Sequence, residues 1–260
     1  MPASESQTLT WQLLVDPAGR PGAENMALDQ ALLDAADRTG ASFLRLYRWS
    51  PSCLSFGRNE PALTRYDRAA IERLGLDVVR RPTGGRAVWH DAEVTYAVAA
   101  PVEAFGSLRE SYCEIHRRLA RALQSLGVPA DLAPNPESRA PLHTGSCFAD
   151  AVGGEVVVRG RKLVGSAQVR QGLAFLQHGS ILLDGSQDIV GAISRPPTAA
   201  SSFRVRGSIT LREALGRTVA FEEVAQAIVS VWDDQLTVTA HYRPLPPVTA
   251  AFGSDWTWRR

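Results

Sequence analysis

One lysine stands out among the residues that could do chemistry. Of the 28 basic residues, 27 are arginine and only Lys162 is lysine. A genome that favours arginine codons explains the general bias, but it does not explain a single retained lysine. An ammonium is a compact donor and a guanidinium is a wide, flat fork, so the two do not exchange where a small cation must meet one oxygen. Lys162 is therefore a candidate functional residue.

The segment around this lysine is strand-like and rich in small residues. Strand alternation puts two sets of side chains on opposite faces: Lys162, Val164 and Ser166 on one, and Leu163, Gly165 and Ala167 on the other. Small residues beside a lysine leave room for a ligand to lie against the strand. The alternative interpretation is an edge-strand lysine whose stem packs on the surface, with a glycine at a bulge.

A Gly-rich basic segment follows a predicted strand. Its residues are Arg80, Arg81, Pro82, Thr83, Gly84, Gly85 and Arg86. Paired glycines let backbone N–H groups approach an anion or a carbonyl oxygen, and arginines can hold phosphate or carboxylate bidentately. The segment matches neither the P-loop nor the dinucleotide fingerprint. A solvated basic turn is the alternative interpretation.

Cys147 ends a Pro-rich segment, residues 134–146, 15 residues before Lys162. If the thiol lies about 4 Å from the ammonium, their attraction at an effective dielectric near 20 is about 4 kcal/mol. Half of that lowers a thiol pKa from about 8.5 to near 7, which would make Cys147 a usable nucleophile. A small residue packed beside Phe148 is the alternative. Cys53, in a predicted strand, is interpreted as structural.

The histidines offer weaker candidates. His90 follows the Gly-rich segment and His178 precedes Gly179, and each could move a proton. Isolated histidines on strands are more often core groups. Cys113 and His116 fall in a predicted helix and are interpreted as structural. The cysteines lack CxxC spacing and the histidines show no ligand spacing, so no metal site is predicted.

The predicted elements mix strands and helices without strict alternation. Helices are predicted at residues 25–35, with Asn25 as the cap, and at 62–74, 107–126 and 221–236. Strands are predicted at 9–15, 43–47, 53–56, 76–79 and 94–99, then as a hairpin at 155–158 and 162–169, and at 173–183. This pattern indicates an α+β fold with largely antiparallel or mixed sheets. We expect a single catalytic domain over residues 1–260, with a helical tail extension from about residue 207.

Composition excludes several classes of protein. A net charge of +1 gives no bulk field to recruit nucleic acid or an anionic membrane. No apolar run reaches the roughly 18 residues that a membrane span needs. The polar residues 1–8 lack the order of a secretory signal, so a cytoplasmic location is expected.

Four segments together resemble the superfamily of lipoate-protein ligases, lipoyl octanoyltransferases and biotin-protein ligases. They are residues 25–29 (NMALD), 80–91 (RRPTGGRAVWHD), 160–168 (GRKLVGSAQ) and 176–180 (LQHGS). The resemblance covers roughly residues 9–185, with a weaker tail at 254–260. Biotin ligases fit worst, because their GRGRxGR loop is absent. The resemblance implies a mixed-sheet catalytic domain in which the Gly-rich loop and the hairpin lysine hold an acyl carbonyl or an acyl-adenylate.

Within the superfamily, two features favour transfer from a thioester over ATP-dependent ligation. Cys147 and Phe148 resemble the nucleophile region of octanoyltransferases whose cysteine precedes the lysine, and no cysteine follows Lys162. The accessory domain of many ligases is also not seen. Residues 149–154 depart from the Pro-Ser and aromatic-Glu pairs of those transferases, so the acyl-chain or acceptor contact there can differ.

The resemblance implies a two-step exchange with Cys147 and Lys162 as catalytic residues. Octanoyl-acyl carrier protein is the expected donor, and the glycine-cleavage H protein or a lipoyl domain is the expected acceptor. No cofactor is expected. The expected substrate-binding residues are Arg80, Arg81, Thr83, Gly84, Gly85, Arg86, His90, Gly165, Ser166, Ala167, His178 and Gly179. The alternatives are a lipoate ligase that uses ATP and Mg²⁺, and a catalytically silent acyl- or carrier-binding module.

Overall fold

The computed structural model describes residues 10–134, 153–195, 207–232, 236–238 and 249–259. Its centre is a six-stranded sheet in the order β10-β11-β6-β2-β1-β12. The strands are β1 (Trp11–Arg20), β2 (Ser42–Trp49), β6 (Glu93–Pro101), β10 (Val164–Gln171), β11 (Ala174–Leu182) and β12 (Leu236–Val238). Strand β1 pairs in parallel with β2 and β12, and the remaining pairs are antiparallel. The predicted α+β class with mixed and antiparallel sheets is confirmed.

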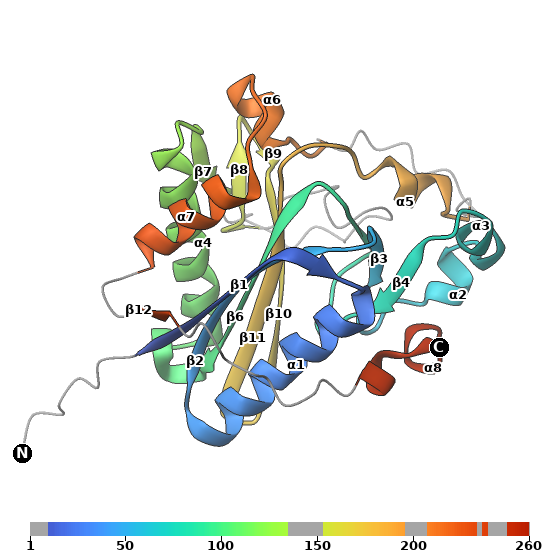
Figure 1. Cartoon of the computed structure of the whole chain (residues 1–260), viewed down its shortest axis with the longest axis horizontal. Helices are drawn as coiled ribbons and strands as arrows, with labels where there is room; N and C mark the ends of the chain where they lie inside the picture. The colour runs from blue at the N-terminus through green and yellow to red at the C-terminus, as the bar shows by residue number, and fades with distance from the viewer. Residues whose placement is uncertain (1–9, 135–152, 196–206, 233–235, 239–248, 260) are drawn as a thin grey trace, which may run out of the picture.

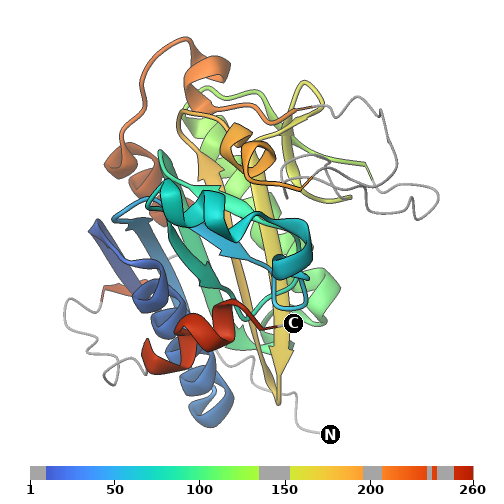
Figure 2. The same cartoon turned by 90° about the vertical axis from the view of Figure 1, so that its right-hand side faces the viewer.

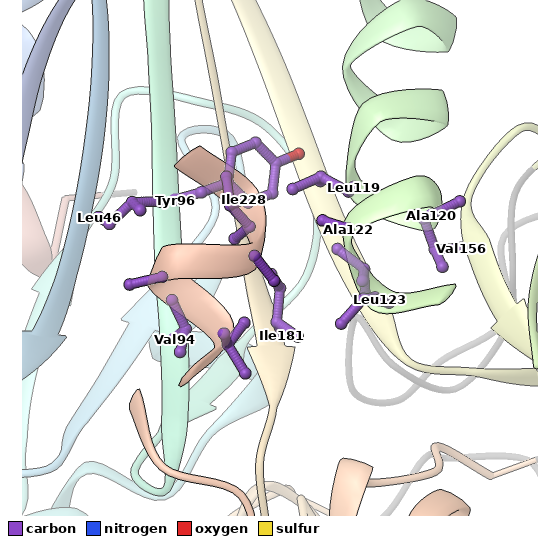
Figure 3. Close-up of a cluster of buried hydrophobic side chains, with 14 of the residues drawn as sticks. Leu46, Val94, Tyr96, Leu119, Ala120, Ala122, Leu123, Val156, Ile181 and Ile228 are labelled. Atoms are coloured by element: carbon purple, nitrogen blue, oxygen red, sulfur yellow. The ribbon is translucent and has the colours of Figure 1, made fainter. Parts of the chain in front are cut away.

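Helices cover both faces of this sheet (Figure 1). Helix α1 (Gly22–Thr39) lies on one face, and α4 (Leu108–Ser125) and α7 (Phe221–Val231) lie on the other. Figure 3 shows the second interface, where Leu119 and Leu123 of α4 and Ile228 of α7 meet sheet residues such as Leu46 and Tyr96. These side chains are fully buried. Burial of apolar surface between the layers fixes the sheet that carries the site.

Two three-stranded sheets flank the large one. The first, in the order β4-β3-β5, holds β3 (Cys53–Phe56), β4 (Asp77–Arg80) and β5 (Val88–His90). The second, in the order β7-β8-β9, holds β7 (Ala130–Leu132), β8 (Val156–Val158) and β9 (Arg161–Lys162). In Figure 2 the short helices near the first sheet, α2 (Ala62–Arg65), α3 (Arg68–Arg73) and α8 (Ser254–Thr257), stand in front of the large sheet.

The remaining elements are short. They are the helices α5 (Asp188–Ala192) and α6 (Leu211–Leu215) and the 3₁₀ turns Val102–Phe105 and Thr249–Phe252. Of the helices within the described residues, none is long and apolar enough to cross a membrane. The single-domain boundaries and the extension from residue 207 stay predictions.

Helix α1 begins earlier than predicted, and Asn25 is not its cap. The helix starts at Gly22 after Pro21, and Asn25 is buried inside it. Its amide donates to the carbonyl oxygens of Arg20 and Arg48, at 3.0 Å each. Asn25 therefore joins the helix to β2, a tertiary role that capping statistics do not describe.

Two further helix predictions were wrong in their extent. The predicted helix at 62–74 is interrupted at Tyr66, and Asp67 caps a second helix by accepting from the N–H of Ala70. The helix predicted to reach residue 236 ends at Val231, and Leu236 instead starts β12. Apolar periodicity continued past both breaks, so periodicity alone could not reveal them.

Ser107 caps α4, because its hydroxyl accepts from the N–H of Glu110. Arg159 and Gly160, between the two strands of the predicted hairpin, form its turn with positive φ values of 52° and 75°. Such a two-residue turn fixes the register of the hairpin that carries Lys162.

Strand alternation holds only after a break at Leu163. Pairing places Ser166 opposite Gly179 and Tyr96, on the α4 face, and Ala167 opposite His178 and Ala97, on the α1 face. Leu163 and Val164 are adjacent, yet both enter the α4-side core. The chain leaves the β7-β8-β9 sheet at Lys162 and joins the large sheet at Val164, and this change of sheet resets the alternation.

Candidate active site

A pocket lies between the large sheet and the β4-β3-β5 sheet, on the α1 face. We call it the inner pocket, and it holds about 350 Å³ of empty space. Its lining is Met26, Tyr47, Trp49, Ser55, Arg81, Val88, His90, Thr95, Gly165, Ser166, Ala167, His178, Gly179 and Ser180.

Register shows which way the inner pocket runs. Tyr47, Thr95, Ser180 and Gly165 are paired in one row across β2, β6, β11 and β10. Three strand spacings of about 4.8 Å make this row about 14 Å long. The pocket therefore extends across the strands, from small residues at the β10 edge to aromatic residues on β2. Trp49 stacks on His90 at the β2 end, with ring centroids 4.0 Å apart.

The polar residues of this pocket are bonded to one another. His90 Nε2 meets Ser55 Oγ at 2.7 Å, and His90 Nδ1 meets Glu93 Oε1 at 2.8 Å. His178 Nε2 meets Thr83 Oγ1 at 2.7 Å, and its Nδ1 meets Asp29 Oδ2 at 2.8 Å. With both nitrogens of each ring occupied by the protein, the two histidines offer the pocket chiefly ring surface. The wall can therefore contact an apolar chain despite its polar composition.

The carboxylate of Asp29, which contacts His178, is paired with a buried arginine. Asp29 and Arg45 are both buried, with Oδ1 and Nη1 2.8 Å apart. Burial raises the pKa of Asp29, but bonds from His178 and Arg45 outweigh it and hold the pKa below its usual value. Burial lowers the pKa of His178, and its bond with Asp29 only partly offsets this. His178 is therefore neutral near pH 7, with Asp29 fixing its tautomer.

A wider cleft opens at the β10 edge and shares Ser166 and Ala167 with the inner pocket. We call it the outer cleft; it spans about 1380 Å³, including the open solvent at its mouth. It is lined by Asn59, Glu60, Pro61, Arg65, Gly84, Gly85, Arg86, Tyr112, Glu155, Lys162, Ser166, Ala167 and Gln168. The Gly-rich loop and the hairpin lysine, far apart in sequence, thus line one cleft.

Lys162 is buried beside a carboxylate. Its Nζ lies 2.8 Å from Oε2 of Glu155, and both side chains are 2% exposed. The hydroxyl of Tyr112 donates to the other carboxylate oxygen of Glu155 at 3.3 Å. A buried ion pair of this kind orders both groups, because leaving either charge without the other is costly. Strand β9 is at the edge of its sheet, but Lys162 is buried there, so the alternative of a lysine packed on the surface is wrong.

The Gly-rich loop is held from within. Nη2 of Arg81 donates to the carbonyl oxygens of Gly84 and Arg86, at 2.9 and 2.7 Å. A Cβ on Gly57 would stand 1.8 Å from the carbonyl oxygen of Gly85, so the loop packs directly on that glycine. A Cβ on Gly84 would meet nothing within 4 Å, which leaves that side of the loop open. The alternative of a solvated turn is therefore wrong for Arg81, which is buried.

Arg80 is placed differently from the other predicted binding residues. Its buried guanidinium donates to the carbonyl oxygens of Gly57, Arg58, Glu60, Trp256, Thr257 and Arg259, at 2.8–3.2 Å. It lines neither the inner pocket nor the outer cleft. These bonds tie the C-terminal α8 to β4, which gives Arg80 a structural role; its predicted contact with substrate stays a prediction. Thr83 lines neither space either, and its hydroxyl is hydrogen-bonded to His178.

Sequence reasoning missed several side chains at this site. His116 Nε2 is 2.8 Å from Ser166 Oγ, which also meets Tyr96 Oη at 2.7 Å. Burial, and then the charge of Lys162, lower the pKa of His116 to about 3, so its ring is neutral. Tyr112 and His116 stand four apart on α4, and this spacing was a signal that both face the same neighbour. A Cβ on Gly179 would crowd Ser166 at 2.5 Å, which explains the glycine.

The structure describes the surroundings of Cys53 but not those of Cys147. Cys147 lies outside the described residues, as does most of the Pro-rich segment that precedes it, so its role stays a prediction. Cys53 is buried in the α1-side core, and burial raises the pKa of its thiol, which fits the structural interpretation. No group of metal-binding side chains occurs among the described residues.

Comparison with known proteins shows the family to which this architecture belongs. Residues 21–232 match the family model described as the lipoyl protein ligase A/B catalytic domain. The chain belongs to this family. The match spans every described residue of the inner pocket and the outer cleft. The predicted superfamily is therefore confirmed.

Two relatives of similar length share the name octanoyltransferase LipM. The octanoyltransferase LipM of Symbiobacterium thermophilum is 38% identical over 96% of this chain and 98% of its own length. That of Kyrpidia tusciae is 41% identical over 87% of both chains. Among solved structures, lipoate-protein ligase A bound with ATP aligns with a TM-score of 0.69 at 18% identity, over 89% of this chain and 87% of its own. A bipartite lipoate protein ligase of Thermoplasma acidophilum aligns at 0.72 and 18%, over 96% of both. These two likenesses show the fold.

Proposed function

We propose that this protein is an octanoyltransferase that moves an acyl group from a carrier-protein thioester to a lysine of a lipoyl-accepting protein. The observation that carries the proposal is the end-to-end match to relatives named octanoyltransferase, at 38% identity over 98% of one of them. An acceptor of the lipoyl-domain type suits both these relatives and the family. The acyl carrier protein donor, the glycine-cleavage H protein as acceptor and a cytoplasmic location stay predictions.

The inner pocket suits an octanoyl chain. Seven C–C bonds of about 1.5 Å in a zigzag span about 9 Å. This length fits within the row of about 14 Å from β10 to β2 once side-chain thickness is subtracted. Gly165 and Ala167 leave room at the entrance, and Trp49 stands at the far end. We assign the chain to this pocket with its carbonyl toward the outer cleft.

The outer cleft suits the reacting thioester. Lys162 lines it, where an ammonium N–H can donate to the carbonyl oxygen as negative charge develops. The Gly84 backbone borders the same space. In this proposal the thiolate of Cys147 attacks the carbonyl carbon and expels the donor thiol. The acceptor amine then attacks the acyl-cysteine, forms the amide and releases the Cys147 thiol.

The test is transfer without ATP. Purified protein is mixed with octanoyl-carrier protein, and the product is digested and mapped by mass spectrometry. We expect one octanoyl group on Cys147, and its passage to a lipoyl domain when that domain is added. Cys147→Ser abolishes both steps, whereas Cys53→Ser leaves Cys147 acylated. An unmodified Cys147, or transfer that requires ATP, would refute the mechanism in favour of ligation.

A further inference from the structure

Among the residues that the structure describes, one cation of the outer cleft has no carboxylate partner. Five charged side chains line it, three cations and two carboxylates. Glu155 lies 2.8 Å from Lys162, and Glu60 lies 3.6 Å from Arg65. Within the described part of the chain, the remaining cation, Arg86, forms no salt bridge. The cleft is therefore positive at the Gly-rich loop.

One nitrogen of Arg86 is also buried without a hydrogen-bond partner in the described part of the chain. Its Nη1 has no hydrogen-bond acceptor among the described residues, although the atom is hidden from solvent. A buried charged donor without an acceptor is less favourable than a buried neutral donor without one. Native proteins tolerate few such atoms, and those at functional sites are typically completed by a ligand.

The loop around Arg86 is built to receive an anion. The carbonyl oxygens of Gly84 and Arg86 accept from Arg81, which turns them toward the protein. None of the backbone hydrogen bonds formed by described loops is donated by Gly84, Gly85 or Arg86. Successive unengaged N–H groups beside a guanidinium form the kind of concavity that binds phosphate. The open side of Gly84 lets such a group approach closely.

We propose that Arg86 binds the phosphodiester of the phosphopantetheine arm of the acyl donor. This inference rests on the proposed function, in which the donor is a thioester. The arm is slender, and its phosphate is its only charged group, so one buried guanidinium nitrogen and a Gly-rich loop suffice to recognise it. Carrier protein and coenzyme A share this chemistry. The surface of a folded acceptor domain is too broad to reach a nitrogen that is hidden from solvent.

The test compares donors with and without the phosphate. KM is measured for octanoyl-carrier protein, octanoyl-coenzyme A and octanoyl-pantetheine, with wild type and Arg86→Gln. We expect the variant to raise KM for both phosphate-containing donors at least about tenfold, the lower end of what a charge-assisted hydrogen bond contributes. KM for octanoyl-pantetheine stays unchanged. An increase in KM for only one of the two phosphate-containing donors would show whether Arg86 binds the phosphate of the carrier protein or that of coenzyme A.

Arg170→Gln is the matched control. It removes the same charge from β10, where Arg170 is exposed and donates to the carbonyl of Gly172 at the hairpin turn. We expect no donor-dependent change. Equal KM increases for all three donors with Arg86→Gln would mean a structural role, and an increase in the acceptor KM alone would mean an acceptor contact. Either result, or no change at all, overturns the proposal.

A binding measurement separates this proposal from the proposed function. Calorimetry with phosphopantetheine itself requires no turnover. Wild type binds it, and Arg86→Gln binds it at least about tenfold more weakly. Binding by wild type without any acyl transfer would refute the octanoyltransferase function and support the phosphate site at Arg86. Acyl transfer without Arg86-dependent binding would support the function and refute the site.

Discussion

Removal of the Lys162 ammonium should cost both stability and activity, and the two losses should separate in a double variant. In Lys162→Met, Glu155 is left buried without its cation. Breaking a buried pair in this way costs about 3–5 kcal/mol. For a domain of this size each kcal/mol lowers Tm by about 2–4 °C, so 3 kcal/mol corresponds to about 6–12 °C. Thermal unfolding followed by circular dichroism measures the change.

The variant Glu155→Gln with Lys162→Met replaces the ion pair by two neutral side chains. Because no charge is stranded, it should recover at least about 2 kcal/mol of the summed losses of the two single variants. Octanoyl transfer should remain absent, since the ammonium that donates to the acyl oxygen is gone. Stability losses that add within about 0.5 kcal/mol would refute the pairing seen at 2.8 Å. Transfer at the wild-type rate by the double variant would refute the role of Lys162.

Three further predictions concern other parts of the site. Trp49→Phe shortens the wall at the β2 end of the inner pocket, so the kcat/KM ratio of decanoyl to octanoyl donors should rise; an unchanged ratio would contradict our placement of the chain. Gly57→Ala should cost at least about 2 kcal/mol in urea unfolding, because its Cβ would overlap the Gly85 carbonyl, whereas Gly84→Ala should keep stability and lose transfer. The pKa of His116 is lowered to about 3, so its ring is neutral in the folded protein and protonates more readily in the unfolded chain, and stability is lost as pH falls below about 6.5. Between pH 6.5 and 5, His116→Gln should lose roughly 1.6 kcal/mol less stability than wild type, and equal losses would refute the burial of His116 as a neutral ring.

Local signals predicted the hairpin and the site segments well. The Arg159-Gly160 turn set the pairing of Val157 with Lys162. That register also puts Glu155, two positions before Val157, on the same face as Lys162. The carboxylate partner of Lys162 could therefore be predicted from the sequence. The change of sheet at Leu163 could not, because it depends on the long-range pairing of β10 with β11.

Local composition could not separate the roles of two adjacent arginines. Arg80 and Arg81 are adjacent in a basic, Gly-rich segment, and composition gives them the same character. Their roles differ because Arg80 meets the carbonyl oxygens of α8, about 176 residues away along the chain, whereas Arg81 folds back onto its own loop. Contacts of such long range are set by packing of the whole chain, and no local pattern records them.

The pairing of Lys162 changes what the lysine can contribute to the reaction. A lone ammonium would lower the pKa of a nearby thiol through its charge, which was the expectation for Cys147. With Glu155 at 2.8 Å the pair carries no net charge, and the field of such a dipole falls off faster with distance than that of a single charge. Its useful effect is then short-ranged and directional, through N–H donors aimed from a fixed position at one oxygen. Glu155 and Tyr112 provide that fixed position, and the compact geometry they require is one that an arginine could not supply.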